Sequence, residues 1–403
     1  MLGWELPPHN SGGLGVACLS LSHALAKKGL KIDFVVPYKA KHSEINFMNV
    51  VSASNLDPLF RFGIGAYDSD EIEKPLITIP GSVSSDQVSI RQIQQTYINF
   101  VDEYLTTHKP DVVHAHDWLT FEAGILAKKK YGVPLIAHVH ATEFDRAGGH
   151  CGNPLVEEIE REGLMLADKI FAVSEATKNI IHEKYHIPLE KIDVVYNSLD
   201  ENFLNTLYSF DESEYKYLES LKKKGFCLVS TVGRFTVQKG LTHLLHAAAK
   251  AIRVNPKLIF ILAGDGEEKN ELIRLASELG ISKNVIFTGF VRGKQLRDIY
   301  SISDVFVMSS ISEPFGLTAL EAAHHGDVLI LTKQSGVSEI LKSAFSYDFW
   351  DEEKLANIIL SLADSPALQK NLKENVASEY RKLSWDDVAK KCLNVYNSLN
   401  KRK

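Results

Sequence analysis

Short apolar runs alternate with amphipathic segments along almost the whole chain, and this alternation limits the fold more than any other feature. A short apolar run bounded by turn residues fits a buried strand, whereas apolar residues three or four apart fit a helix. Strands that alternate with helices form a parallel sheet with helices on both faces. The sequence therefore predicts an α/β fold.

The first half of the chain carries one such alternating series. A short strand at Met1–Trp4 stops before Pro7, so either this strand is short or the true start lies upstream. Ala40–Ser89 has no clear period and is left unassigned, although an insertion there could touch an acceptor. Further strands are expected at Lys31–Val36, Asp111–Ala115, Pro134–Val139, Lys169–Val173 and Ile192–Val195.

A polar stretch from about Asn197 to Lys224 separates this series from a second one. Because 403 residues exceed one ordinary core, two domains are expected. We place an N-terminal acceptor-binding domain at 1–200 and a C-terminal nucleotide-sugar domain at 201–380, both doubly wound and Rossmann-like, with a cleft between them. Residues 381–403 form a final helix, expected to pack back on the first domain. Strands of the second series are expected at Cys227–Val232, Leu258–Ala263, Val285–Thr288, Val305–Met308 and Val328–Leu331.

Composition removes several classes of function. The net charge of −6 argues against a nucleic-acid surface. The four cysteines are far apart and form no C-x-x-C motif, which fits a reducing compartment and no zinc site built from cysteines. No apolar run approaches the length needed to span a membrane. We expect a cytoplasmic monomer or homo-oligomer without stable membrane insertion.

The stretch from Ser312 to Glu321 places a turn and a helix start directly after an apolar run. A helix that begins at about Gly316 offers unpaired amides and a partial positive charge to a phosphate. Glu313 lies before this helix, and Glu321 lies about one turn inside it. Two carboxylates beside a phosphate niche suit a ligand that is part anion and part sugar, although solvated acids in an ordinary strand–turn–helix unit are the alternative.

Other expected strands also end in residues that suit a nucleotide. Arg234 and Lys239 lie five residues apart around one turn, where a guanidinium and an ammonium can clamp a diphosphate, unless each is an ordinary surface cation. Gly264 ends a strand and would let a base or ribose approach the backbone. Near the N-terminus, Gly13 lies in a glycine-rich turn into a helix, which fits either a phosphate cradle or a turn without ligand.

Histidines occur in two H-x-H pairs at the ends of two expected strands: His114 with His116, and His138 with His140. Residues i and i+2 face the same side of a strand, so the pairs are expected to line a cleft. The alternative is a metal cluster, because this spacing also suits zinc. We favour the cleft.

Taken in order, these motifs resemble retaining glycosyltransferase family 4, of the GT-B class, along nearly the whole chain. The glycogen and starch synthase members are the most similar, through the histidine motifs. The matching pieces are Gly12-Gly13-Leu14, His114-Ala115-His116-Asp117-Trp118, His138-Val139-His140-Ala141-Thr142-Glu143, Gly233-Arg234, Lys239-Gly240, Ala263-Gly264-Asp265-Gly266, Glu313 with Glu321, and Ser335-Gly336-Val337-Ser338-Glu339.

The resemblance implies transfer of a hexose from a nucleotide diphosphate sugar with retention of configuration. Glu313 would hold the sugar and His140 would hydrogen-bond it, while Arg234 and Lys239 would neutralise the leaving diphosphate without any metal or other cofactor. Glu321 would bind the ribose. The remaining nucleotide-sugar contacts implied are Gly13, Gly264, Val291, Phe315, Gly316, Leu317 and Thr318.

The resemblance leaves the substrates open. Asn10 stands where glycogen synthases that use ADP-glucose carry lysine, so UDP-glucose and ADP-glucose both remain candidates. The expected partners are this donor and a glycan acceptor. Extension of an α-1,4-glucan is the favoured reaction, and a lipid-linked or envelope glycan is the alternative acceptor. A UDP-N-acetylhexosamine epimerase of the same fold is a third interpretation, and it leaves the pair Glu313 and Glu321 unexplained.

Overall fold

A computed structural model describes residues 1–7, 12–39, 42, 44–55, 89–199 and 212–400. The chain divides into two compact units, which are considered separately. Unit 1 contains Met1–Asp200 and Ser384–Lys403, and unit 2 contains Glu201–Leu383. Asn10 and most of the unassigned segment 40–89 lie outside the described residues.

Unit 1 is built on parallel strands. β3 (Val113–His116), β4 (Leu135–Val139), β5 (Lys169–Ala172) and β6 (Ile192–Val194) form one sheet in that order. β1 (Asp33–Val36) pairs with β2 (Asn49–Ser52), which lies inside the segment that the sequence left unassigned. The residues expected to form a first strand make only single bridges, from Leu2 to Val35 and from Leu2 to Ala115. Leu2 thus joins the two sets of strands.

Helices pack around this sheet, and residues with known capping preferences mark where they begin and end. Ser89 and Gln92 form a capping box at the start of α2, and Gly132 ends α3 in the left-handed conformation. The helices of unit 1 are α1 (Gly13–Lys27), α2 (Ile90–Thr107), α3 (Trp118–Tyr131), α4 (Glu143–Arg146), α5 (Pro154–Leu166), α6 (Glu175–Tyr185), the 3₁₀ turn η2 (Leu189–Lys191) and α15 (Trp385–Asn400).

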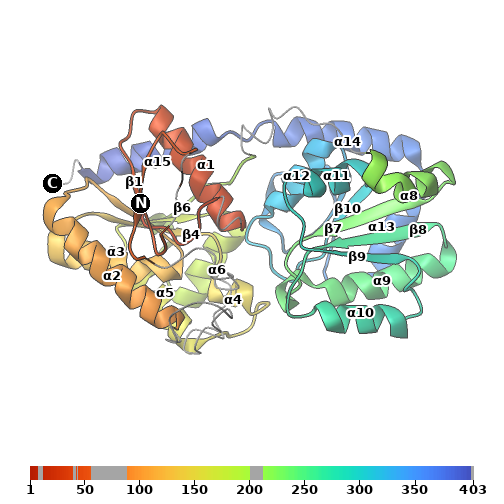
Figure 1. Cartoon of the computed structure of the whole chain (residues 1–403), viewed down its shortest axis with the longest axis horizontal. Coiled ribbons are helices and arrows are strands. Elements are labelled where there is room, and N and C mark those ends of the chain that lie inside the picture. Colours follow the sequence, from red (N-terminus) through yellow and green to blue (C-terminus); the bar gives the residue numbers. More distant parts are fainter. Residues whose placement is uncertain (8–11, 40–41, 43, 56–88, 200–211, 401–403) are drawn as a thin grey trace. The chain divides into compact units, whose positions relative to one another are not determined.

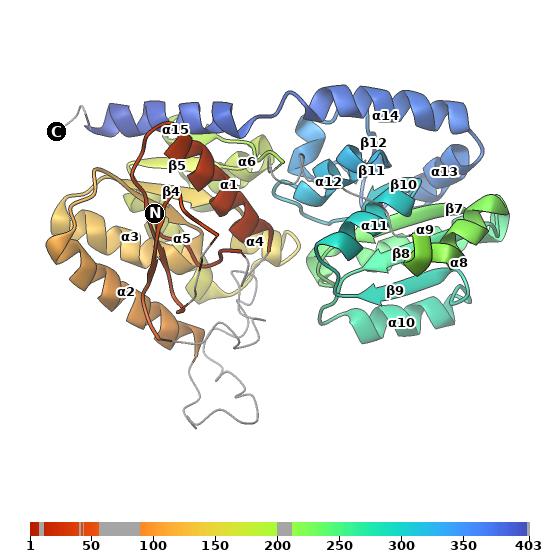
Figure 2. The same ribbon diagram turned by 45° about the horizontal axis from the view of Figure 1, so that its top comes forward.

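The last helix completes the core of unit 1. α15 runs beside α1 in both views (Figures 1 and 2), and Lys28, which directly follows α1, forms an ion pair with Asp386 of α15. Its apolar side belongs to the same core as β3 and β4, through Trp385, Ala389, Cys392, Tyr396 and Leu399.

Unit 2 has a six-stranded parallel sheet in the order β12-β11-β10-β7-β8-β9. Its strands are β7 (Cys227–Val232), β8 (Leu258–Ala263), β9 (Val285–Gly289), β10 (Val305–Met308), β11 (Val328–Thr332) and β12 (Phe345–Tyr347). Its helices are α8 (Glu212–Lys223), η3 (Val237–Lys239), α9 (Leu241–Val254), α10 (Lys269–Glu278), α11 (Lys294–Ile302), α12 (Leu317–His325), η4 (Gly336–Glu339), α13 (Glu352–Ala363) and α14 (Pro366–Tyr380).

β8 shows why both faces of this sheet are covered. Leu258, Phe260 and Leu262 point into a core shared with α9 and α13. Ile259 and Ile261 point the other way, into a core shared with α8 and α11. Successive side chains of a strand face opposite sides, so a strand that is apolar throughout requires helices on both faces. The predicted α/β class, with two Rossmann-like units, is confirmed.

Candidate active site

Four predicted site residues of unit 2 come together at one edge of its sheet: Arg234, Lys239, Glu313 and Thr318. β11, β10, β7 and β8 are neighbours and run parallel, so their carboxyl ends meet at that edge. Ligands of doubly wound folds bind there. A pocket opens at this place, and its lining includes Gly233, Arg234, Lys239, Ser309, Ser310, Glu313 and Thr318.

Glu313 and Lys239 form an ion pair in this pocket. Lys239 Nζ lies 2.6 Å from Glu313 Oε2, and the two side chains are 24% and 12% exposed. Ser310 Oγ donates to the same carboxylate oxygen at 2.9 Å. The backbone of Glu313 is held as well, because its amide donates to the carbonyl of Gln334 and its carbonyl accepts from the amide of Gly336. Sequence reasoning missed Ser310, for which no motif gave a signal.

Two glycines let the backbone around Lys239 and Arg234 close tightly. Gly240 has φ 59°, and a Cβ there would lie 2.3 Å from the carbonyl oxygen of Ser309. Gly264 has φ 153°, and a Cβ there would lie 1.8 Å from the carbonyl oxygen of Gly233. No side chain fits at either position. The glycine that was expected to admit a nucleotide therefore has a second role, which is to let β7 and β8 end side by side.

The start of α12 lies at the same pocket, whose lining includes Thr318. Gly316 precedes the helix with φ 110°, and a Cβ there would press on Met308 and Val337. Leu317 and Thr318 occupy the first helical positions, where amides lack partners within the helix. Phe315 lies in the core at 3% exposure, and its carbonyl accepts from the amide of Val337. Phe315 therefore anchors the turn through its buried ring.

Glu321 lies further along α12 and accepts a hydrogen bond from the Tyr300 hydroxyl at 2.8 Å. Burial raises the pKa of Glu321 to about 7, and this hydrogen bond lowers it in part. The carboxyl is therefore poised between its neutral and charged forms near neutral pH. Val291, expected near the base, is partly buried and packs against the core beside α8 and α11.

In unit 1 the four histidines form a buried cluster, because β3 and β4 pair in a register that places His116 beside His138. His114 Nε2 lies 3.1 Å from His138 Nδ1, and His116 Nδ1 lies 3.0 Å from His140 Nε2. The Tyr396 hydroxyl of α15 lies 2.7 Å from His114 Nδ1. Burial lowers the pKa of each histidine, to about 3 for His140, so the rings are neutral.

Asp117 fixes the loop that carries His140. Its Oδ1 accepts the amides of His140 at 2.6 Å and Ala141 at 3.4 Å. Asp117 itself has φ 58°, a conformation that few residues other than glycine adopt. The sequence identified Asp117 as part of a motif without indicating this role. Gly13 is the first residue of α1, which places it at the N-terminus of that helix as expected.

Known proteins give the context for this geometry. A model described as "Glycosyltransferase Family 4" matches residues 11–203, and one described as "Glycosyl transferases group 1" matches residues 216–379. An uncharacterized glycosyltransferase of Methanocaldococcus jannaschii is 28% identical over 98% of this chain and 97% of its own. A glycogen synthase of Mycobacterium tuberculosis is 27% identical over 98% of this chain and 93% of its own.

Solved structures agree on the fold. Sucrose-phosphate synthase from Thermosynechococcus elongatus superposes with a TM-score of 0.76 at 19% identity, over 98% of this chain and 95% of that one. The catalytic domain of starch synthase IV from Arabidopsis thaliana, bound to ADP and acarbose, gives 0.73 at 17% identity over 99% and 98%. The fold is thus that of GT-B glycosyltransferases.

The chain belongs to the family-4 type of glycosyltransferase within that class, and it is therefore a transferase enzyme. The predicted resemblance is confirmed, including the similarity to a glycogen synthase. No helix among the described residues is both long and apolar enough to cross a membrane.

Proposed function

We propose that this chain is a retaining hexosyltransferase that moves glucose from UDP-glucose or ADP-glucose to an α-1,4-glucan. The observation that carries the proposal is the pocket of unit 2, where the Lys239–Glu313 pair lies with Arg234 and the start of α12. The neighbour that binds ADP and the relative that is a glycogen synthase support the donor and the acceptor.

The negative charge that develops on the leaving diphosphate is the main charge that the active site must stabilise in this reaction. Negative charge grows on its bridging oxygen as the glycosidic bond breaks, and fixed positive groups stabilise that charge best in a partly enclosed pocket. Arg234 and Lys239 line the pocket together, and the amides of Leu317 and Thr318 add donors at the helix start. We propose that these groups replace a metal ion, so that turnover needs none.

Two carboxylates are proposed to bind the hydroxyl groups of the donor sugar and of the ribose. Glu313 would accept hydrogen bonds from the sugar hydroxyls once the diphosphate draws Lys239 away from it. Glu321 would accept from the ribose hydroxyls, and its charged form is the better acceptor. His140 would hydrogen-bond the donor sugar. Retention follows if the leaving phosphate takes the acceptor's proton on the face that it departs from.

A lipid-linked or envelope glycan is the second candidate acceptor, because one solved structure of the same fold is described as a glycosyltransferase involved in lipopolysaccharide biosynthesis. The epimerase interpretation is set aside because both family models describe glycosyltransferases.

The first test is thermal unfolding with saturating UDP, ADP or GDP. A ligand at about a hundred times its Kd adds roughly 2.7 kcal/mol to the unfolding free energy, enough to raise Tm. The matching glucose ester is then incubated with maltooligosaccharides, and the new linkage is read by NMR. An α-linked, lengthened glucan supports the proposal. No shift with any diphosphate would contradict it.

A lysine pair provides the control for this test. Lys239→Met should remove turnover, whereas Lys250→Met should leave turnover unchanged. Lys250 Nζ forms an ion pair with Glu352 Oε2 at 3.3 Å, and Lys250 is not among the residues that line the pocket. If both variants lose turnover equally, the substitutions have damaged the fold of unit 2, and the loss cannot be assigned to a catalytic role of Lys239.

A further inference from the structure

The histidine cluster of unit 1 contains polar atoms that the hydrogen bonds described above do not satisfy. His116 Nε2, His138 Nε2 and Asp117 Oδ2 are buried and have no hydrogen-bond partner. A buried polar atom without a partner costs about 1–3 kcal/mol, and such atoms in a native fold often indicate a water or an ion. The hydrogen bonds of the cluster thus leave part of it unsatisfied, and one of these atoms belongs to His116, which also lies beside Cys18.

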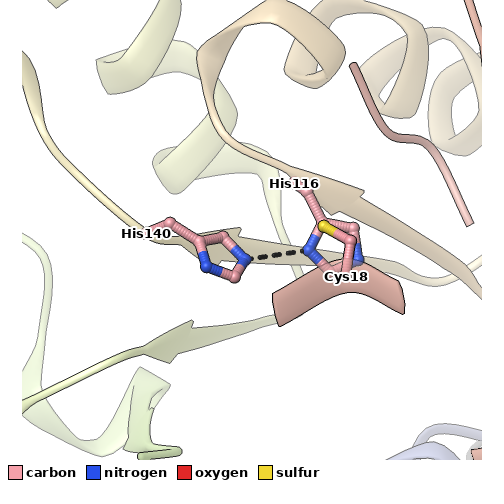
Figure 3. Close-up of side chains that lie close together, drawn as sticks. All are labelled: Cys18, His116 and His140. Carbon is pink, nitrogen blue, oxygen red and sulfur yellow. Dashed lines mark hydrogen bonds between the residues drawn. The ribbon is translucent and has the colours of Figure 1, made fainter. Parts of the chain in front are cut away.

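Cys18 supplies a soft ligand atom to the same place. Its Sγ and one ring nitrogen each of His116 and His140 all lie within 4.8 Å of one another. Figure 3 shows Cys18 on α1 next to the ring of His116, with the dashed line joining His116 to His140. Cysteine and histidine are the ligands that zinc prefers in proteins.

The spacing of the two rings already suits a metal. His116 Nδ1 and His140 Nε2 are 3.0 Å apart. Two imidazole nitrogens on one tetrahedral zinc lie roughly 3.3 Å apart, given a Zn–N bond of about 2.0–2.1 Å. The gap that now holds a shared proton therefore needs to open by only a few tenths of an ångström.

The charge around the thiol also favours a cation. Cys18 is buried, and the carboxyl groups of Asp117 and Glu5 lie close enough to interact with its thiol electrostatically. The same two carboxylates would stabilise a divalent cation at this position. Of the three side chains His140 is the most exposed, at 7%, while Cys18 and His116 are 1% and 0% exposed.

We propose that Cys18, His116 and His140 form a binding site for a thiophilic divalent cation of the zinc type. Binding replaces the S–H bond of Cys18 with a bond from sulfur to the metal, and one proton leaves to the solvent. The hydrogen bond between the two rings is lost, and the ring that donated its proton in that bond must carry this proton on its other nitrogen. Each ring then donates one nitrogen lone pair to the ion. A second trio, His114, His116 and His138, meets the same distance criterion, but these rings are at most 1% exposed.

Inhibition of transfer is the expected consequence, and this consequence alone rests on the proposed function. His140 is the residue proposed to contact the donor sugar, and a ring bound to a metal cannot reorient toward it. Zinc should therefore slow transfer and a chelator should restore it. Metal binding itself is measured without activity, so its failure and the failure of the proposed function are distinguishable.

Cobalt titration of the full chain tests the site, because a Co²⁺–thiolate bond gives a charge-transfer band in the near ultraviolet. We expect one Co²⁺ per chain, displaced by Zn²⁺, with the band lost in Cys18→Ser. Cys392→Ser is the matched control, because Cys392 is equally buried in unit 1 and belongs to neither trio. It should keep the band.

Circular dichroism establishes that each variant is folded before titration. His138→Gln separates the two trios and should retain the band and the stoichiometry. The proposal is overturned if the wild-type chain gives no charge-transfer band, if Cys18→Ser binds Co²⁺ as the wild type does, or if His138→Gln abolishes binding.

Discussion

Replacing Glu313 with glutamine should strengthen the binding of a nucleoside diphosphate while it removes turnover. Without ligand, Lys239 is held 2.6 Å from the Glu313 carboxylate. A diphosphate must compete with that carboxylate for the ammonium group. Glutamine keeps the size of the side chain and an oxygen for Ser310, but it lacks the competing charge.

The geometry sets the size of this effect. Two unit charges 2.6 Å apart attract by roughly 1.6 kcal/mol in bulk water and by roughly 6 kcal/mol at an effective dielectric constant of about 20. Side chains that are 24% and 12% exposed lie between these limits. Hydration that both groups recover on separation offsets most of the attraction. We expect a net gain of about 1–2 kcal/mol, which lowers Kd about 5- to 30-fold.

Isothermal titration with the diphosphate that stabilises the wild type measures this gain. Glu352→Gln is the matched control, because Glu352 pairs with Lys250 in the same unit and is 22% exposed; its Kd should not change. Turnover of the Glu313→Gln enzyme should fall by orders of magnitude. Weaker diphosphate binding in a folded Glu313→Gln variant would refute the competition, and would instead make the carboxylate a contributor to the affinity.

Three further measurements follow from the structure. Gly264→Ala should lower the free energy of unfolding in urea by more than about 3 kcal/mol, because the new Cβ would clash with backbone that cannot move aside. Gly280→Ala should lower it by about 1 kcal/mol, because Gly280 has φ 74° and no atom within 4 Å of a Cβ. Similar losses in the two variants would contradict the packing argument. The folded state of Glu321 holds a proton more tightly than the unfolded state, since its pKa rises from 4.5 to about 7. The stability of the wild type relative to Glu321→Gln should therefore fall by about 1–3 kcal/mol as pH rises from about 4.5 to 7, and then level off. If the two stability curves run parallel over this pH range, the pKa of Glu321 is not raised in the folded state. Tyr396→Phe should lose about 1–3 kcal/mol of unfolding free energy by leaving His114 Nδ1 unpaired; an unchanged Tm would show that water replaces the hydroxyl.

The strands were largely predictable, because a strand buried on both faces is apolar throughout. The runs at Cys227–Val232 and Leu258–Ala263 became β7 and β8 without change of boundaries. α13 was missed, although Leu355, Ile359 and Leu362 have helical spacing and Asp351 caps the helix. The apolar spacing that predicts a helix was therefore present in this segment, but it was overlooked among the polar residues that separate Leu355, Ile359 and Leu362.

Contacts within the site were less predictable than the elements that carry them. The face shared by the two histidine pairs followed from strand geometry, and the register of β3 and β4 bore it out. The expectation that these residues line a cleft is not met in unit 1, where all four are buried. The Tyr396–His114 contact joins residues 282 positions apart. It depends on where α15 packs, which no local pattern specifies. The bond from Tyr300 to Glu321 likewise depends on how α11 lies against α12.

The return of α15 to unit 1 has a consequence for how the protein can be made and dissected. Unit 2 is one continuous segment, Glu201–Leu383, whereas unit 1 needs both Met1–Asp200 and Ser384–Lys403. A ribosome that has finished unit 2 has therefore not yet supplied the helix that closes the core of unit 1. The portion synthesised first is the portion completed last. A fragment for separate expression should thus be cut from unit 2, and unit 1 requires a fusion that joins the last helix back to its partner segment.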